Sequence, residues 1–333
     1  MEIIPVFFTF NRNYVVAAEV AIYSLLKYAS PRYEYKLYVL HTDIPYTMQK
    51  EMSTLVSRFA NASLEFIETS AFDDDDNILQ EKSHFSKEIY YKLIAAEIFP
   101  QYDRIICTDV DVVFIGDISE SYFMHPDKFF YYAGIGQILE SDRMKNYKGK
   151  FDDKEIDILK KEIAAGYLLM NLKAIREHSM QKRLTDYYKA NYHRLCLPEQ
   201  DCMILCCWPY VEYLPIKFCV CNYYYKTDLA TAVFYSENDD LPKAHEEACH
   251  LFNEALVHPV QLHYVGPSKP WNSLFVTKQR IWLSLLWESG CTARLFKALP
   301  RLMQQKLKRY SLKRFLSKVA ARLKPGKTVT AKT

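Results

Sequence analysis

The sequence of 333 residues is 50% hydrophobic and has a formal net charge of +3, from 43 basic and 40 acidic side chains. A chain of this size and composition buries a large core, as one big domain or two modest ones. Only 8 residues are glycine, and neither G-x-G-x-x-G nor G-x-x-x-x-G-K-[ST] occurs. This argues against dinucleotide-dependent dehydrogenases and P-loop enzymes, whose phosphate-binding loops need glycines at fixed spacings.

The cysteines favour a reducing compartment. There are 9 of them, with no C-x-x-C pair, and several lie in apolar runs where reduced, buried thiols are common. A zinc site within the cluster from Cys196 to Cys221 is an alternative, although the spacing matches neither a zinc ribbon nor a finger. The N-terminal MEIIPVFFTFN lacks signal-peptide features, and no stretch of about 20 apolar residues predicts a membrane span. We therefore expect a cytoplasmic protein.

The N-terminal part of the chain alternates between strand and helix patterns. In chain order we expect strand Ile3–Phe10, helix Tyr14–Ala29, strand Tyr35–His41, helix Pro45–Ala60 and strand Ser63–Glu68. This alternation is typical of a parallel sheet with crossover helices. An acidic loop at Asp73–Asp76, a helix at Ser86–Phe99 and an apolar strand from Arg104 to Ile115 are expected to follow.

Two carboxylates interrupt this last apolar run, at Asp109 and Asp111. A buried, unpaired carboxylate is costly, so two of them need a reason. They lie towards the end of their strand, where open α/β sheets bind ligands, and a period of two places both on one side of the chain. Oxygen ligands of this kind suit Mg²⁺ or Mn²⁺, which in turn hold a diphosphate. The alternative is a pair of acids at an ordinary strand end, held by a neighbouring Lys or Arg.

Four further segments accompany the D-x-D run: FTFNRNY (Phe8–Tyr14), AAGYLLMNLKAIRE (Ala164–Glu177), PEQD (Pro198–Asp201) and HYVGPSKPW (His263–Trp271). All five together resemble glycosyltransferase family 8. They follow the family's order over roughly residues 3 to 275. The family contains bacterial lipopolysaccharide galactosyl- and glucosyltransferases and glycogenin. The resemblance implies a GT-A-type α/β fold, with a Rossmann-like, mostly parallel sheet flanked by helices.

The resemblance also implies roles for individual residues. A divalent metal, Mn²⁺ with Mg²⁺ as the alternative, would be held by Asp109, Asp111 and His263. The nucleotide sugar would contact Thr9, Asn11 and Tyr14 at the uridine, and Lys92, Asp109, Val110, Gly266 and Lys269 around the diphosphate. Gln200 would lie beneath the anomeric carbon, and Glu199 and Asp201 would bind sugar hydroxyls.

The implied reaction transfers a hexose from UDP-glucose or UDP-galactose to a glycan acceptor, in lipopolysaccharide or surface polysaccharide synthesis. The family retains anomeric configuration, and because a carboxamide is a poor nucleophile we expect front-face attack beside Gln200. The chain departs from the family pattern with Glu199 in place of Asp and Ala164 in place of Asn. Two alternatives remain: a non-catalytic nucleotide-sugar binder, and a metal-dependent nucleotidyltransferase or phosphosugar hydrolase, which would not need His263 or Lys269.

The C-terminal segment differs sharply in charge from the rest. Residues 289–333 contain 13 basic and no acidic side chains, whereas residues 1–288 contain 30 basic and 40 acidic ones. Within Pro300–Lys324, apolar residues recur at helical spacing among basic ones, which predicts an amphipathic helix on an anionic membrane surface. We therefore expect a catalytic domain at 1–285 and a membrane-association tail at 286–333, attached peripherally to the inner face of the cell membrane near lipid-linked glycan acceptors. A helix docked on the acidic body and an RNA-binding tail are the alternatives; no nucleic-acid partner is expected.

Overall fold

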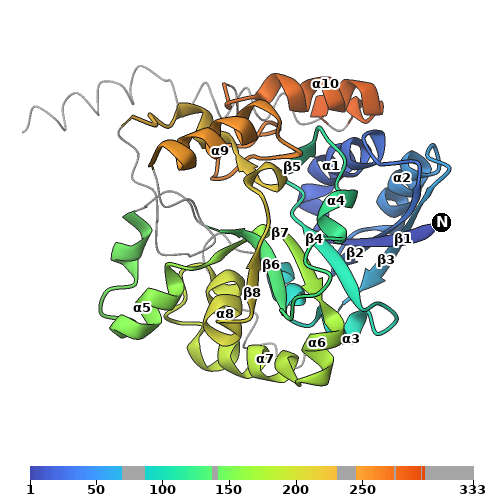
Figure 1. Cartoon of the computed structure of the whole chain (residues 1–333). Coiled ribbons are helices and arrows are strands. Elements are labelled where there is room, and N and C mark those ends of the chain that lie inside the picture. The colour runs from blue at the N-terminus through green and yellow to red at the C-terminus, as the bar shows by residue number, and fades with distance from the viewer. Residues whose placement is uncertain (70–86, 137–141, 231–244, 274, 294, 297–333) are drawn as a thin grey trace, which may run out of the picture.

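A seven-stranded mixed sheet forms the centre of the molecule in the computed structural model, which describes residues 1–69, 87–136, 142–230, 245–273, 275–293 and 295–296 (Figure 1). The strand order is β3-β2-β1-β4-β7-β6-β8. The strands are β1 (Glu2–Thr9), β2 (Tyr33–His41), β3 (Ala62–Glu68), β4 (Arg104–Thr108), β6 (Tyr132–Gly136), β7 (Ile163–Asn171) and β8 (Val211–Tyr213). Only β7 runs against the others, because its pairings with β4 and β6 are antiparallel and the remaining pairings are parallel.

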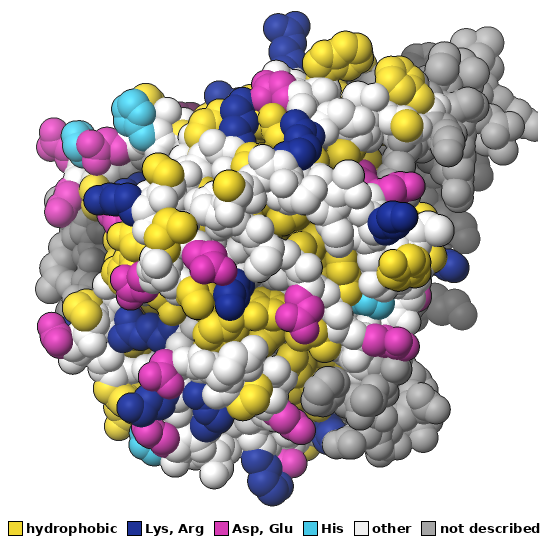
Figure 2. Space-filling view, turned by 90° about the vertical axis from the view of Figure 1, so that its right-hand side faces the viewer, with side chains coloured by type: hydrophobic (Ala, Val, Ile, Leu, Met, Phe, Trp, Pro, Cys, Tyr) yellow, Lys and Arg dark blue, Asp and Glu magenta, His cyan; other side chains and the backbone are white. Residues whose placement is uncertain are grey.

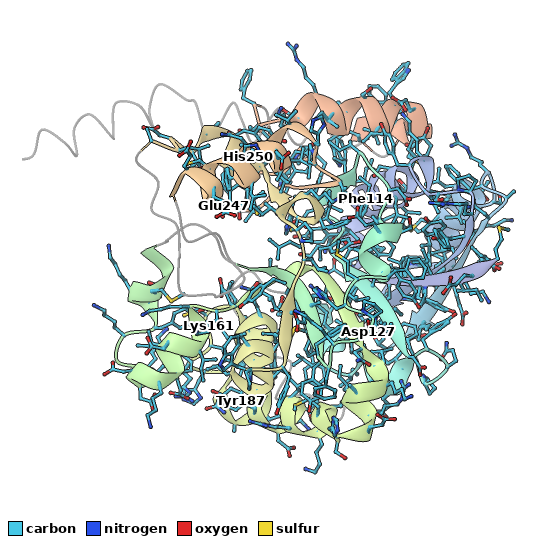
Figure 3. All side chains as sticks on the ribbon, in the orientation of Figure 1. Phe114, Asp127, Lys161, Tyr187, Glu247 and His250 are labelled. Carbon is cyan, nitrogen blue, oxygen red and sulfur yellow. The ribbon has the colours of Figure 1, made fainter. Side chains whose placement is uncertain are left out.

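Helices cover both faces of this sheet, and the alternation of side chains along each strand supplies both cores. In β1, Val6 and Phe8 pack into one hydrophobic cluster with α1 (Val15–Lys27) and α2 (Tyr46–Val56). Phe7 points to the other face. There it joins a cluster with α5 (Asp153–Leu159), α6 (Leu172–Glu177), α7 (Met180–Asn191) and α8 (Pro198–Cys207). Figure 3 shows these two layers, with Phe114 on the upper side and Tyr187 of α7 below.

A second, three-stranded sheet lies above the first in Figure 1, in the order β5-β10-β9. It consists of β5 (Val112–Phe114), β9 (Val220–Cys221) and β10 (Gln261–His263). Apolar side chains of these strands, among them Val113 and Leu262, form a third cluster with α9 (His245–Val257) and α10 (Gln279–Ser289). Short helices α3 (Ala95–Ile98) and α4 (Ser119–Tyr122) complete the α-helices of the described residues.

The predicted mostly parallel α/β sheet flanked by helices is confirmed. The first three strands and two helices also form, within a few residues of the expected bounds. Two expectations were wrong: the helix expected at 86–99 is a 3-10 helix over Lys87–Lys92 followed by the short α3, and the strand expected at 104–115 is two strands in different sheets. The expected acidic loop at 73–76 and tail helix at 300–324 lie outside the described residues.

Three further observations concern the regions of the predicted domain boundary and membrane contact. α10 extends across the boundary expected at residue 285 and ends at Ser289. Figure 2 shows the face to the right in Figure 1, where basic and acidic side chains are interspersed. None of the helices among the described residues is long and apolar enough to cross a membrane.

Candidate active site

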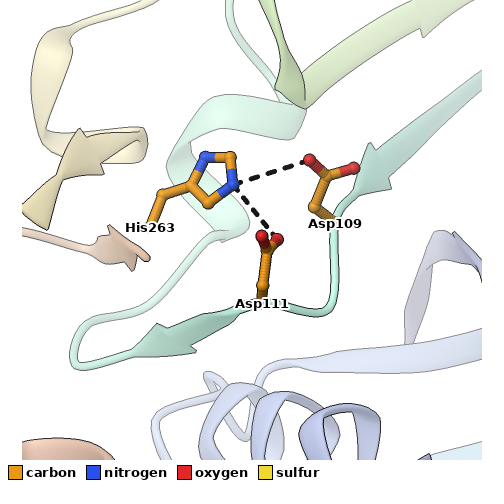
Figure 4. Close-up of side chains that lie close together, drawn as sticks. All are labelled: Asp109, Asp111 and His263. Carbon is orange, nitrogen blue, oxygen red and sulfur yellow. Dashed lines mark hydrogen bonds and ion pairs between the residues drawn. The ribbon is translucent and has the colours of Figure 1, made fainter. Parts of the chain in front are cut away.

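Asp109, Asp111 and His263 form a compact group between the two sheets. One potential ligand atom from each lies within 4.8 Å of the others. His263 Nε2 is 3.1 Å from Asp111 Oδ1 and 3.6 Å from Asp109 Oδ2. Figure 4 shows both carboxylates turned towards the imidazole. Asp111 and His263 are more than 150 positions apart in the sequence. The fold nevertheless brings the three residues together, as predicted.

The backbone explains why these side chains meet. β4 ends at Thr108 and β5 begins at Val112, so the D-x-D residues span the step from the large sheet to the small one. In the small sheet β10 pairs with β5, and His263 lies opposite Val112. The Tyr264 N–H donates to the Asp111 carbonyl at 2.9 Å, and the Asp109 N–H donates to the Gly166 carbonyl at 3.1 Å.

Gly166 on β7 provides the space that the imidazole occupies. A Cβ atom at this position would lie 2.6 Å from His263 Cε1, 2.7 Å from Nδ1 and 3.3 Å from Asp109 Oδ2. Such contacts are far inside van der Waals separation, so any larger residue would push the ring away from the carboxylates. The sequence indicated this glycine only as part of a longer motif, although a glycine inside a strand is itself a sign of close approach.

Two lysines balance the negative charge of the group. The Lys92 ammonium donates to Asp109 Oδ1 at 2.7 Å and to the Ala165 carbonyl at 2.9 Å, and it is fully buried. Burial opposes its charged form, but Asp109, Cys107 and Glu199 outweigh this effect and raise its pKa. Lys269 pairs with Asp111 and donates to the Tyr264 carbonyl at 2.6 Å. Lys269 therefore lies at the D-x-D site, and Lys92 lies beneath it.

The same charges shift the pKa values of the group itself. Burial favours neutral His263, but its contacts with Asp111 and Asp109 raise its pKa to about 9. Burial likewise favours a neutral Asp111, yet His263 and Lys269 lower its pKa. Ionised carboxylates beside an imidazole form a donor set that suits a divalent cation such as Mn²⁺. The three residues therefore fit a metal site, in which the cation would replace the positive charge of the imidazolium.

α8 brings the PEQD segment to the same region from the opposite face of the large sheet. Gln200 Oε1 accepts the Ala165 N–H at 3.1 Å, one residue from Gly166. Glu199 Oε1 lies 3.9 Å from the Lys92 ammonium, and Glu199 Oε2 is buried without a hydrogen-bond partner among the described residues. Burial, against the opposing charge of Lys92, raises the Glu199 pKa. Glu199 and Gln200 thus lie near the D-x-D group.

Asp201 occupies a different environment. It is fully buried, and its Oδ1 accepts the Tyr147 hydroxyl at 2.5 Å. Its Oδ2 accepts the backbone N–H groups of Cys196 at 2.7 Å and Leu197 at 3.0 Å. Both oxygens are therefore engaged by the protein, and this arrangement fixes the chain where it enters α8.

Two of the three residues expected at the uridine contact Glu88, a buried residue that the sequence did not reveal. Thr9 donates to the Glu88 carbonyl at 2.6 Å, and Asn11 lies 3.5 Å from the buried Glu88 carboxylate. The Tyr14 ring meets Trp271 edge to face at 6.0 Å. Burial, followed by the charges of Asp111 and Asp109, raises the Tyr14 pKa.

The remaining predicted contacts depend on the backbone. Val110 carries a buried side chain, 5% exposed, in the cluster shared with α1. Gly266 has a φ of +87°, a conformation that strongly favours glycine, and nothing lies within 4 Å of the position its Cβ would take. A contact from the Val110 side chain is therefore disfavoured, and Gly266 has no side chain to offer, so any ligand contact at these positions would come from the backbone.

Comparison with known proteins identifies the class. The sequence pattern of glycosyl transferase family 8 matches residues 5–274. The chain therefore belongs to this family and is a glycosyltransferase. No curated protein sequence matches it.

Solved structures show the same fold. The bifunctional glycosyltransferase WbbM superposes with a TM-score of 0.69 at 21% identity over 89% of this chain, which spans 51% of WbbM. The galactosyltransferase LgtC, in a complex with donor and acceptor sugar analogs, superposes with a TM-score of 0.65 at 19% identity, over 86% of this chain and 96% of LgtC. GlyE of Streptococcus pneumoniae TIGR4 superposes with a TM-score of 0.57 at 18% identity, over 85% of this chain and 60% of GlyE.

Proposed function

We propose that this glycosyltransferase moves a hexose from UDP-glucose or UDP-galactose to a glycan acceptor with retention of configuration, and that it requires Mn²⁺, with Mg²⁺ as a substitute. The observation that carries the proposal is the Asp109–Asp111–His263 group, with Lys269 beside it, in a family 8 chain. The LgtC complex with donor and acceptor sugar analogs supports the same kind of partners.

Asp109, Asp111 and His263 would hold the metal. A bound divalent ion supplies positive charge to the departing diphosphate. Lys269 would donate to the same diphosphate as a point charge, because it already lies at Asp111 on the edge of the group. Lys92 is buried under Asp109, so we assign it the task of holding that carboxylate in place rather than direct contact with phosphate.

Thr9, Asn11 and Tyr14 would bind the uridine, with the Tyr14 ring as a stacking face and Glu88 ordering the other two. The backbone at Val110 and Gly266 would approach the diphosphate. Because Tyr14 is held edge to face by Trp271, its ring is preorganised for a flat base.

Gln200 would lie beneath the anomeric carbon, and Glu199 would accept a sugar hydroxyl with its unpartnered oxygen. A carboxamide is a weak nucleophile, so retention at Gln200 favours attack by the acceptor on the same face from which UDP leaves. A solved LgtC structure carries a glutamine-to-glutamate substitution described as an active-site mutant, which supports a glutamine in this role. Asp201 would act by fixing α8, since its oxygens are already engaged.

The acceptor we propose is a glycan, or a lipid-linked glycan, of lipopolysaccharide or surface polysaccharide. The basic segment at 289–333 supports a peripheral location at the cytoplasmic face of the membrane, where such acceptors are assembled.

The test is UDP release from UDP-glucose and UDP-galactose, with and without acceptor, in Mn²⁺ and in excess EDTA. We expect EDTA, Asp109→Asn and Asp111→Asn each to lower turnover by at least about 100-fold, because a neutral amide binds the cation weakly. Asp103→Asn is the matched control, since this carboxylate lies on the same segment but is 75% exposed.

Three outcomes would contradict the proposal. Near-normal activity of either site variant in Mn²⁺ would exclude the metal role. Equal turnover of GDP- and CMP-sugars would exclude the uridine assignment. Tight UDP-sugar binding without release of UDP, even with acceptor oligosaccharides, would instead favour the non-catalytic binder suggested by Ala164.

A further inference from the structure

The imidazole of His263 has a second contact, on the side away from the carboxylates. Its Nδ1 atom lies 3.6 Å from the sulfur of Cys219, within hydrogen-bonding distance for this larger atom. Cys219 is 1% exposed, so little solvent reaches the sulfur. A histidine that binds a metal through Nε2 almost always donates its Nδ1 hydrogen to an acceptor, which fixes the tautomer and the orientation of the ring.

The backbone holds Cys219 in this position. The residue directly precedes β9, which pairs in parallel with β10 so that Cys221 lies opposite His263. The Cys219 N–H donates to the Ile216 carbonyl at 2.9 Å. The small sheet therefore brings together three elements: Asp111 before β5, His263 at the end of β10 and Cys219 before β9.

The surroundings of the ring limit where Nδ1 can find a partner. A thiol sulfur has lone pairs that accept an N–H, so Cys219 can take the Nδ1 hydrogen of His263. On the β7 side, a Cβ on Gly166 would lie 2.7 Å from the same Nδ1 atom. The Nδ1 edge of the ring is thus enclosed between Gly166 and Cys219.

We propose that Cys219 is a positioning residue for metal binding: it accepts the Nδ1 hydrogen of His263 and directs the Nε2 lone pair towards Asp109 and Asp111. This inference rests on the proposed metal role of those three residues. A sulfur acceptor is weaker than the carboxylate or carbonyl that usually takes this place, so it orders the ring without adding a charge to an already acidic site.

The test compares Mn²⁺ affinity, measured calorimetrically on the nucleotide-free protein, for wild type and three cysteine variants. We expect Cys219→Ala to weaken Mn²⁺ binding by about 10- to 100-fold. Cys219→Ser keeps most of the affinity, because its hydroxyl oxygen also accepts the Nδ1 hydrogen. Cys202→Ala is the matched control: it is equally buried and removes one thiol on α8, which donates to the Leu184 carbonyl at 3.2 Å instead.

A second readout follows the hydrogen itself. In the protein loaded with diamagnetic Mg²⁺, the Nδ1 proton of His263 gives a protected low-field NMR signal in wild type and Cys219→Ser, and loses that protection in Cys219→Ala. The presence and chemical shift of this signal report which ring nitrogen carries the hydrogen, and Cys202→Ala shows how far loosened packing alone lowers its protection.

The outcomes separate this inference from the proposed function. Wild-type Mn²⁺ binding that Cys219→Ala leaves unchanged overturns the role of Cys219 alone. The same holds when Cys202→Ala and Cys219→Ala weaken binding equally, because that result shows only loosened packing. A wild-type protein that binds no Mn²⁺ overturns both the metal site and the role of Cys219.

Discussion

At the scale of single residues, Gly166 is the position where the site tolerates least change. Gly166→Ala would place a Cβ atom 2.6 Å from the His263 ring, so we expect the ring to move and Mn²⁺ affinity to fall by about tenfold or more. Gly134→Ala is the control, because its Cβ would meet apolar side chains, the nearest at 3.0 Å, in the neighbouring strand. Calorimetric titration with Mn²⁺ checks this, and equal affinities for the two variants would show that the space at Gly166 does not matter.

Lys92 illustrates how a buried cation balances the charge of an acidic site and orders it. Lys92→Met removes two charge-assisted hydrogen bonds, to Asp109 and Ala165, and leaves the Asp109 carboxylate with the more distant His263, at 3.6 Å. We expect the free energy of unfolding to fall by about 2–4 kcal/mol, measured by urea denaturation without metal. Lys182→Met serves as control: its pair with Asp186 is 79% and 59% exposed, so its loss should change stability by less than about 0.5 kcal/mol. A similar small effect at Lys92 would contradict the assignment.

The sequence identified the group of Asp109, Asp111 and His263 because its three members lie in short motifs with distinctive residue types. It did not identify Glu88, Gly166 or Cys219, since each acts through a contact between distant segments. Cys219 lies 44 positions from His263, and nothing in its neighbours' identity indicates that pairing. Lys92 was predicted near the diphosphate, but whether a lysine reaches a ligand or lies beneath a carboxylate depends on burial that only the fold determines.

At the scale of elements, the D-x-D segment shows a limit of hydrophobic patterning. Between Arg104 and Ile115 the apolar residues resume directly after Asp109 and Asp111, so the pattern predicted one strand. In the structure β4 pairs with β1 and β7, whereas β5 pairs with β10. Apolar pattern reports burial but not the identity of the partner strand, which here comes from residues 261–263. Asp109 and Asp111 therefore lie in the connection between the two sheets rather than within a strand.

Asp201 tests whether α8 is positioned by its own first turn. Both oxygens of Asp201 accept hydrogen bonds, three in all, whereas Asp201→Asn replaces one oxygen with an NH2 group that cannot accept them. We therefore expect the free energy of unfolding, measured by urea denaturation, to fall by about 2–3 kcal/mol. Because Glu199 and Gln200 precede it on α8, turnover should also fall. Asp186→Asn, on the surface of α7 with a 59% exposed carboxylate, is the control. Unchanged stability together with a raised KM for the donor would instead support direct binding of sugar hydroxyls by Asp201.

At the scale of the whole molecule, the alternation of strands and helices in the sequence predicted the parallel half of the sheet. It did not predict the reversed direction of β7. A strand's direction depends on the path of the connection before it, and periodicity is the same for both directions. β7 nevertheless matters, because its reversed course brings Ala165 and Gly166 to the edge where β4 ends. Motif order predicted the fold more completely than the pattern of elements.

The last prediction concerns the basic C-terminal segment. Residues 297–333 contain 12 basic and no acidic side chains. Each basic residue near an anionic leaflet contributes about 1 kcal/mol, so the segment suffices for reversible attachment. We place the truncation after Phe296, because Cys291 and Leu295 still pack against the cluster around Trp282. The truncated protein should no longer sediment with anionic liposomes and should keep its UDP-sugar hydrolysis.

A full-length variant separates charge from length in this experiment. Changing the 7 basic residues between Lys306 and Arg322 to glutamine keeps the segment but removes its main cluster of charge. If electrostatics drive attachment, this variant loses liposome binding as the truncation does, and wild-type binding weakens as salt rises because screening shortens the reach of each charge. Binding that survives truncation, or that ignores both salt and lipid charge, would place the membrane contact elsewhere on the molecule. Lost hydrolysis on truncation would instead show that residues 297–333 support the catalytic domain itself.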